Sequence, residues 1–345
     1  MTSRVRVFTR DGVPLAELDV NLQRTWLLSR YGEANFLISP KDLKATEPLL
    51  QFGNIVLAEH TTIQPWVGVI DTPREWSDGL IKVNLHSAEY LLNYRITGMT
   101  EAYTDQYGSI FKAMINAGNS ADDFNLLEVG DVYLDSLSVT KLYNYANVYE
   151  SIIGLSDQSG YEWGVEPSIA ATGKLILKAR WAKRFGSKIN FTLQDGWNIK
   201  LESSMLQEQG MIYNMVNVYG KGDPFANKPV GTAIDYVSIG KYGSRAMAVY
   251  ADANNVDQLN NIAAQTLAAF KAPRRTFAVS VIDVGGAFAQ CRLGNILSLK
   301  YFSVGFGARS TPGATATVRI RELSYQDVDN VLCLTVDEII GVKPE

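Results

Sequence analysis

Strands with alternating hydrophobic and polar positions occur in two parts of the chain, in the same order. In each part a strand leads through a loop to a Gly-Asn pair, Gly53-Asn54 or Gly294-Asn295, and three more strands follow. The predicted strands are residues 36–38, 55–60, 66–70 and 81–85 in the first part, and 277–282, 296–302, 317–321 and 331–336 in the second. Because a whole series recurs, the pattern predicts a duplicated β-barrel module. Two unrelated β segments of one large all-β protein are the alternative.

The two predicted copies differ mainly in one loop. Residues 303–315 of the second copy are glycine-rich and form a longer loop than the counterpart in the first copy. Loops tolerate such differences better than strands do. Ahead of the first copy, Val5 and Val7 alternate with polar residues, and Asp11-Gly12 predicts a hairpin turn.

The residues between the two copies have a different pattern. Helical spacing of hydrophobic residues predicts one helix around residues 110–118, ended by Gly118, and another at 142–154, ended by Gly154. A short helical turn is expected at 87–93, with Ser87 as its cap. Strands are predicted at residues 161–165, 174–181, 189–194, 197–201 and 211–219.

A further helix is predicted over residues 257–271. Its hydrophobic stripe consists of Val256, Leu259, Ile262, Ala263, Leu267 and Phe270. Asp252, Asn254 or Asn255 can cap its start, and Pro273 prevents its continuation. A stripe of this kind is more often core than a partner-binding surface.

These elements predict an α+β, mainly β fold in which two β-barrel domains flank an α+β insert. The predicted domains are residues 1–98 for the first barrel, 99–230 for the helical and α+β middle region, and 231–345 for the second barrel with helix 256–271. A chain of 345 residues is long enough for two or three domains.

Composition narrows the classes of function. Hydrophobic residues make up 46% of the chain and charged residues 20%, which is typical of a globular protein. The net charge of −4 disfavours tight nucleic-acid binding, since no basic excess is present to neutralise phosphates. The first residues lack the apolar core of a signal peptide, and no run is long enough for a membrane anchor.

Metal and disulfide chemistry has little support. Cys291 and Cys333 are both predicted to lie in strands of the second copy and are interpreted as buried free thiols, although adjacent strands would also allow them to pair. His60 and His86 lack ligand spacing. We therefore predict no metal and no cofactor.

Candidate catalytic groups are also weak. The carboxylate pairs Asp122-Asp123, Asp131 with Asp135, and Asp327 with Asp329 could serve a glycosidase, but acids beside Gly, Ser and Asn are usually turn residues. Gly285-Gly286, Gly305-Phe306-Gly307 and Lys221-Gly222-Asp223 are interpreted as loops and turns. Aromatic residues that could form a sugar-stacking surface are Trp66, Trp76, Tyr103, Tyr107, Trp163 and Trp197. We predict no catalytic residues and no enzyme activity.

Several segments resemble phage tail hub proteins, a family related to the hub portion of secretion-system spike proteins. The first barrel of that family carries a Gly-[Asn/Asp] strand followed by a W-x-G-x-I strand, which residues 52–57 and 65–70 resemble. Residues 215–222 are similar to its N-x-V-x-V-Y-G strand, and residues 238–245 to its S-I-x-x-Y-G-x-R segment. A helix and a closing Gly-[Asn/Asp] strand follow in the expected order, so the resemblance covers most of the chain.

The resemblance implies tail-tube-like barrels and a structural role in a virion. It implies a homotrimer whose two barrels per copy form a pseudo-sixfold ring, which joins the sixfold tail tube or distal tail protein to a threefold spike or fibre. The tape measure protein and DNA would pass through this hub without specific binding, and assembly would take place in the host bacterial cytoplasm. The alternatives are a glycan-binding tail-tip module and a tail-associated cell-wall hydrolase.

Overall fold

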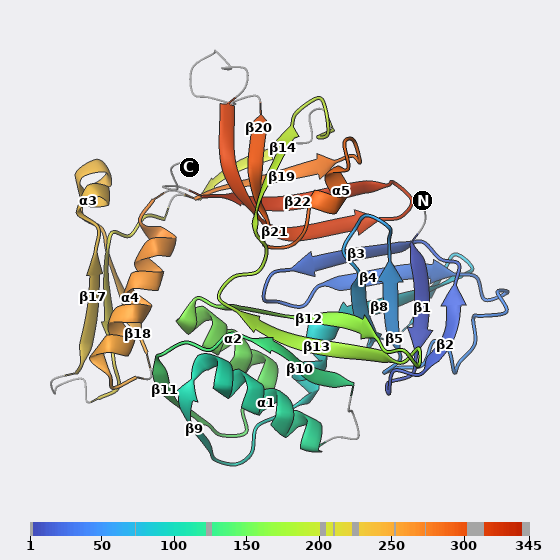
Figure 1. The fold of residues 1–345 in the computed structure, drawn as a ribbon, viewed down its shortest axis with the longest axis horizontal. Coiled ribbons are helices and arrows are strands. Elements are labelled where there is room, and N and C mark those ends of the chain that lie inside the picture. The colour runs from blue at the N-terminus through green and yellow to red at the C-terminus, as the bar shows by residue number, and fades with distance from the viewer. Residues whose placement is uncertain are drawn as a thin grey trace.

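A computed structural model of the protein describes residues 3–72, 74–121, 126–200, 205–209, 211–222, 228–251, 253–272, 274–301 and 314–339. Strands dominate both ends of the chain, and most helices lie between them in sequence (Figure 1). Pairing joins strands from both ends into one sheet of 14 described strands. The fold is therefore α+β and mainly β, as the sequence predicts.

The first β half contains the strands nearest the N-terminus. They are β1 (Arg4–Phe8), β2 (Pro14–Leu18), β3 (Leu22–Leu27), β4 (Glu33–Ile38), β5 (Ile55–Glu59), β6 (Trp66–Ile70), β7 (Glu75–Ser77) and β8 (Leu80–Ser87). Alternation explains these strands: in β8, Ile81, Val83 and Leu85 are buried, while the residues between them are partly exposed. One face of each strand thereby enters the core.

The second β half combines strands from the middle and the end of the chain. Its elements are β14 (Lys188–Gln194), β15 (Met205–Gln209), β19 (Arg274–Val281), α5 (Ala287–Gln290), β20 (Ile296–Tyr301), β21 (Ala314–Gln326) and β22 (Val331–Glu338). The predicted strand at 197–201 is wrong, because Ile199 makes only isolated bridges to Asp195 and Val281. Residues 303–313 of the predicted long loop lie outside the described residues, and Ala314 and Thr315 already belong to β21.

The predicted correspondence between the two series of strands is confirmed by their pairing. In the first β half, β4 pairs with β8, β8 with β6, and β6 with β5. In the second, β19 pairs with β22, β22 with β21, and β21 with β20. All six pairings are antiparallel. The two halves therefore repeat one pairing scheme.

The two Gly-Asn glycines begin these equivalent strands in the same way. Gly53 has a φ of +86° and Gly294 a φ of +80°, which are backbone conformations that glycine adopts without steric cost. The Gly53 N–H donates to the Ile70 carbonyl at 2.9 Å, and the Gly294 N–H donates to the Ile320 carbonyl at the same distance. Ile70 and Ile320 are thus equivalent positions.

The asparagines also match. The Asn54 side-chain amide donates to the Leu49 carbonyl at 3.1 Å, and the Asn295 amide donates to the Gln290 carbonyl at 2.9 Å. In both cases the acceptor lies five residues earlier in the chain. The two asparagines therefore fix the turn before the strand, and their role is structural.

The middle domain packs against the first β half. Its elements are the 3₁₀ helix η1 (Ala88–Tyr94), β9 (Glu101–Gln106), α1 (Tyr107–Ala121), β10 (Leu127–Val132), β11 (Ser138–Tyr143), α2 (Val148–Ser159), β12 (Glu162–Ile169) and β13 (Leu175–Ala182). Its buried residues form one cluster with Phe8, Ile55, Leu57, Val67 and Val69 of the first β half.

Several helix boundaries differ from the sequence predictions. α1 continues past Gly118 to Ala121, and α2 continues past Gly154 to Ser159, where Gly160 at φ +71° ends it. A glycine inside a helix costs only about 1 kcal/mol, which packing can offset. The helix predicted from residue 142 is wrong at its start, because residues up to 143 form β11. Near residues 87–93 the helical turn is confirmed as η1, but Ser87 makes no side-chain cap.

A small domain lies between β15 and β19. It contains β16 (Met215–Tyr219), β17 (Val230–Ile234), α3 (Tyr236–Tyr242), β18 (Ala246–Tyr250) and α4 (Val256–Phe270). The predicted helix is confirmed as α4, and the Asn255 side chain accepts a hydrogen bond from the Asp257 N–H at its start. Leu259, Ile262 and Leu267 bury the stripe against Val216 and Val218 of β16, so α4 is a core helix of this domain.

The predicted domain boundaries after residues 98 and 230 remain a proposal. β14 and β15 come from the predicted middle region, yet they pair with β20 and β19 of the predicted second barrel. One hydrophobic cluster contains buried residues of both β halves. The two β halves thus share a core.

Candidate functional site

The two β halves meet where β21 pairs with β3. Arg24 on β3 and Asp327 at the end of β21 form an ion pair, with 3.3 Å between Arg24 Nη1 and Asp327 Oδ2, and neither side chain is exposed. Ser3 Oγ donates to Asp327 Oδ1 at 2.6 Å and accepts from Arg24 Nη2 at 2.6 Å. The Leu22 N–H donates to Asp327 Oδ2 at 2.9 Å. We call this cluster and the β3–β21 pairing the joint.

Aromatic rings complete the joint. The Arg24 guanidinium lies 4.9 Å from the centroid of the Tyr325 ring and 5.5 Å from that of Trp26. Burial lowers the pKa of Arg24 from its ordinary value, while the charge of Asp327 opposes this shift. Loss of one partner of a buried pair typically costs about 3–5 kcal/mol, because the other charge stays buried. The joint therefore fixes how the two halves are placed.

A second buried ion pair attaches the second β half to the middle domain. Arg319 on β21 makes two hydrogen bonds to Glu162 on β12, at 2.5 and 2.6 Å. Arg319 also donates to the carbonyls of Gly294 (3.1 Å) and Phe185 (3.0 Å). The Phe185 N–H donates to Glu162 Oε2 at 2.7 Å. This arrangement encloses the start of β20.

The surroundings of the two Gly-Asn pairs consequently differ. A Cβ on Gly294 would lie 2.4 Å from the Phe185 carbonyl oxygen, and one on Gly186 would lie 2.2 Å from the Gly294 carbonyl carbon. A Cβ on Gly53 would meet no described atom within 4 Å. The space beside the Gly53 Cα is empty of described atoms, whereas Gly294 is covered by residues that lead into β14.

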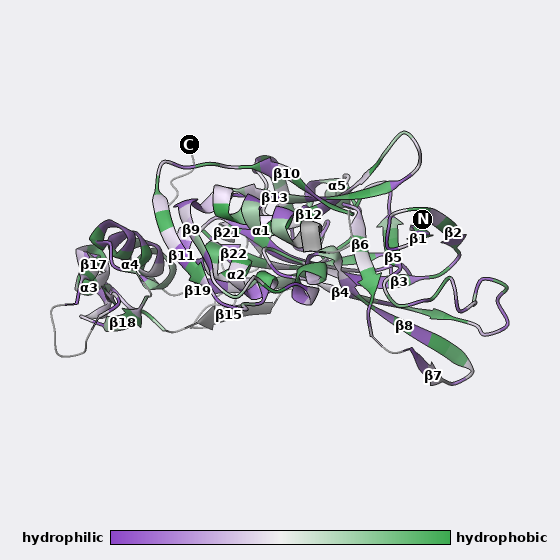
Figure 2. Ribbon diagram, turned by 90° about the horizontal axis from the view of Figure 1, so that it is seen from below, coloured by the Kyte–Doolittle hydropathy of each residue, from purple (hydrophilic) through white to green (hydrophobic). Residues whose placement is uncertain are grey.

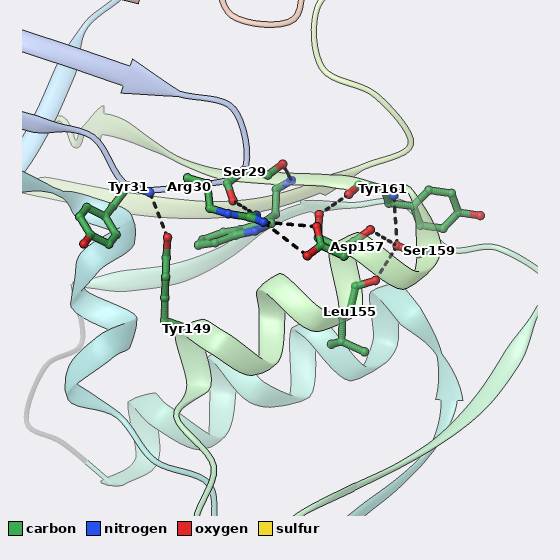
Figure 3. A network of polar contacts seen from close by, with 10 residues as sticks. Ser29, Arg30, Tyr31, Tyr149, Leu155, Asp157, Ser159 and Tyr161 are labelled. Atoms are coloured by element: carbon green, nitrogen blue, oxygen red, sulfur yellow. Dashed lines mark hydrogen bonds and ion pairs between the residues drawn. The ribbon is translucent and has the colours of Figure 1, made fainter. Parts of the chain in front are cut away.

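The turn between β3 and β4 contacts α2 and β12 (Figure 3). Its contacts are the ion pair of Arg30 with Asp157 (3.3 Å), the bond from the Tyr31 N–H to the Tyr149 hydroxyl (3.3 Å), and the bond from the Trp163 N–H to Ser29 Oγ (3.2 Å). A cleft of about 590 Å³ beside this turn is also lined by α4 and β21. Arg30 and Asp157, which line this cleft, form the ion pair named above.

The structure describes two of the three candidate carboxylate pairs, and one member of each has a structural partner. Asp327 is held inside the joint, and Asp329 lies exposed in the turn after β21. Asp131 pairs with Arg180, with 3.6 Å between Oδ2 and Nη2. Asp122-Asp123 lie outside the described residues.

The histidines and cysteines were considered as metal ligands, and the cysteines also as a disulfide. His86 Nδ1 lies 3.3 Å from Asp71, and the His86 ring stacks on Tyr90. The two thiols are free. Cys291 is buried as predicted, but it ends α5 and does not lie in a strand. Cys333 is exposed, contrary to prediction, because it lies on the outward side of β22. Within the described ranges, no three His, Cys, Asp or Glu residues are placed to hold a metal.

The aromatic residues do not form one exposed surface. Trp66, Tyr107 and Trp163 are buried, Tyr103 is partly buried, and Trp76 and Trp197 are exposed at 66% and 48%. Trp76 is on β7, whereas the Trp197 ring lies beside Gly285 near α5. Gly285 and Gly286 adopt positive φ in the loop before α5, as predicted for loop glycines. No membrane-crossing helix is found in the part of the chain that the structure describes.

Sequence reasoning missed the joint and the Arg319–Glu162 pair. One signal was present in β3, where Arg24 takes an inward position between buried Leu22 and Trp26. An arginine at such a position predicts a buried acidic partner. Its partner is 303 residues away in sequence and could not be identified locally.

Comparisons with known proteins agree with this fold. No protein-family model and no curated protein sequence matches the chain. Among solved structures, prophage tail protein gp18 from Listeria monocytogenes EGD-e gives a TM-score of 0.63 at 13% identity, over 99% of this chain and 95% of that one. The 43 kDa tail protein of prophage MuSo2 from Shewanella oneidensis gives 0.62 at 10% identity, over 97% and 98%.

A third structure, the tail protein from Neisseria meningitidis MC58, gives a TM-score of 0.59 at 12% identity and covers 99% of this chain and 98% of that chain. At these identities the similarity concerns the fold, and it extends over nearly the whole chain. The protein therefore has the fold of phage and prophage tail proteins, as the hub-like segments of its sequence predict.

Proposed function

We propose that the protein is a structural virion component, the homotrimeric hub of a phage tail tip. The observation that carries this proposal is the repeated pairing scheme of the two β halves. Two similar halves in each of three copies supply six similar positions around an axis. Such a ring matches a sixfold tube on one face and a threefold spike or fibre on the other.

The proposal includes the partners of such a ring. The hub binds two further copies of itself, the tail tube or distal tail protein above, and a spike or fibre protein below. The tape measure protein and DNA pass through its centre. The net charge of −4 is compatible with passage of DNA without tight binding. The protein acts in the virion tail after assembly in the host bacterial cytoplasm, and its role is mechanical, without catalysis.

The mass of the purified chain, alone and mixed with its tube protein, tests this function. We expect a trimer, in which the two β halves of each copy are related by a rotation of about 60° around the trimer axis. A chain that stays monomeric and binds neither tube nor tip proteins would contradict the proposal. A trimer whose halves do not follow a common axis would leave assembly intact and remove the symmetry-matching role.

A further inference from the structure

The joint provides a template for a contact between copies. Within one chain, residues 322–326 at the far end of β21 pair antiparallel with β3. Tyr325 lies opposite Arg24 in this pairing and is only 1% exposed. Its ring also packs against Phe288 of α5. The neighbouring strand β3 and α5 thus together bury an aromatic residue at the tip of a long hairpin.

Register identifies the matching hairpin in the first β half. Ile70 and Ile320 are equivalent, since each accepts a hydrogen bond from a Gly-Asn glycine. Ile70 pairs with Leu85 on β8, and Ile320 pairs with Val336 on β22. Leu85 and Val336 are therefore equivalent positions on the two returning strands.

The counterpart of Tyr325 then follows. Ile81 lies four residues before Leu85 and pairs with Trp76, and Leu332 lies four residues before Val336 and pairs with Tyr325. Trp76 on β7 is consequently the counterpart of Tyr325. The two side chains differ in burial, because Trp76 is 66% exposed and Tyr325 only 1%.

β7 lacks a neighbouring strand equivalent to β3, which helps to bury Tyr325. Among the described residues it pairs only with β8, so its outer edge is unpaired. Figure 2 shows the β7–β8 hairpin projecting from one side of the molecule. An exposed strand edge that carries a large aromatic side chain is a site at which another strand can add.

The missing neighbour would be the counterpart of β3, and that strand is β15. Ala34 on β4 pairs with Leu85, and Phe277 on β19 pairs with Val336, so Ala34 and Phe277 are also equivalent. Arg24 on β3 pairs with Ala34, and Leu206 on β15 pairs with Phe277. Arg24 therefore corresponds to Leu206. In the described part of the chain β15 pairs only with β19, so its other edge is also unpaired.

We propose that β7 of one copy pairs antiparallel with β15 of a second copy, and so repeats the joint between chains. The register of the joint places Trp76 opposite Leu206 of the second copy, Glu75 opposite Gln207, and Arg74 opposite Glu208. The sequence thus sets an aromatic beside an aliphatic residue. Arg74 already forms an ion pair with Glu47 of its own chain, at 2.8 Å, so the proposed contact rests on the two strand edges and on Trp76.

This inference rests on the proposed function, because it names the contact that closes the homotrimer. Each copy offers β7 at one end of the strand run β15-β19-β22-β21-β3-β4-β8-β7 and β15 at the other. Such a contact is heterologous, and it closes into a ring when its rotation equals that of the joint. Joints within chains and contacts between chains then alternate around the ring.

The first experiment compares Trp76→Glu with Tyr236→Glu by mass measurement in solution. Both side chains are exposed, at 66% and 77%, but Tyr236 is on α3 in the small domain. We expect Trp76→Glu to be a folded monomer, with the circular dichroism spectrum of the wild type, and Tyr236→Glu to remain a trimer. A Trp76→Glu variant that is as trimeric as the wild type would overturn the contact.

A second experiment tests the register by oxidation. In a Cys333→Ser background, Glu75→Cys with Gln207→Cys is expected to give a disulfide between copies, because opposed residues bring Cα atoms within disulfide range. The control is Glu75→Cys with Glu17→Cys, which uses the other exposed edge strand, β2, and is expected to stay unlinked.

The outcomes separate this contact from the function. A wild-type trimer that gives no Glu75–Gln207 link and tolerates Trp76→Glu retains the hub and excludes the β7–β15 contact. A link in the control alone would place the neighbour on β2 and would likewise overturn the contact. A wild type that is monomeric, and forms no link, would overturn both proposals.

Discussion

The two β halves share one strand-pairing scheme but have different surroundings. The middle domain covers an apolar surface of the first half that includes Ile55 and Val67. The second half is attached to the same domain by the buried Arg319–Glu162 pair. β1 runs antiparallel beside β5, whereas β14 runs parallel beside the equivalent strand β20. Strand pairing has thus been retained where sheet continuity requires it, and the packing around it has diverged.

The largest expected effect comes from removing the polar attachment of the second half. Arg319→Met leaves the Glu162 carboxylate buried without its cation, so we expect a loss of about 3–5 kcal/mol in the free energy of unfolding, measured with denaturant. Arg6→Met is the matched control, because its partner Glu59 is 40% exposed, and should cost less than about 1 kcal/mol. Equal losses in the two variants would contradict the view that the buried Arg319–Glu162 pair stabilises the fold more than the partly exposed Arg6–Glu59 pair.

The two Gly-Asn glycines allow a direct comparison between halves. Gly53→Ala introduces only the strain of a positive φ, about 1–2 kcal/mol. Gly294→Ala adds a clash with the Phe185 carbonyl oxygen, so its cost should be larger by about 1–3 kcal/mol. Chemical denaturation of the two variants measures both values. The comparison fails if Gly53→Ala is at least as destabilising as Gly294→Ala.

A smaller change in the free energy of unfolding is expected when pH changes the protonation of Glu89, at the contact of the first half with the middle domain. Glu89 accepts hydrogen bonds from Ser87 Oγ and the Val165 N–H, and burial raises its pKa above the ordinary value of 4.5. The folded state then binds the proton more tightly than the unfolded state. The contribution of Glu89 to stability should therefore fall as pH rises from 4.5 to the folded-state pKa and stay constant above it.

Glu89→Gln should remove this contribution, so its free energy of unfolding relative to the wild type should rise over the same pH range. Urea denaturation at a series of pH values measures it, with Glu33→Gln on an exposed position of β4 as the control. Parallel pH profiles for the wild type and Glu89→Gln would show that Glu89 does not carry this dependence.

The smallest change concerns thiol reactivity and leaves stability unaffected. Cys291 is buried ahead of the second Gly-Asn pair, and burial raises its pKa to about 12. Cys333 is exposed on β22. A thiol reagent at neutral pH should label one cysteine in the native protein and both after unfolding, as counted by mass spectrometry. Rapid native labelling of Cys291 would show that this turn opens.

The sheet could largely be predicted because each strand carries its own alternation, as in the inward Ile81, Val83 and Leu85 of β8. Helix ends were less predictable, since tertiary packing carries α1 through Gly118. The joint could not be predicted from the sequence, because Arg24 and Asp327 come into contact only when the two halves pair. The alternation of β15 did not identify β19 as its partner. The two strands pair as in a β-hairpin, but the small domain separates them in sequence.

That separation is itself informative. Gln209, the last residue of β15, pairs with Arg274, the first residue of β19, so the chain leaves the sheet and returns to it at adjacent positions. In the first half the equivalent strands β3 and β4 are joined by a short turn. The whole small domain (Figure 1) therefore occupies the place that a short turn has between β3 and β4. A single recombination event could exchange it for another module without altering the order of any strand in the sheet.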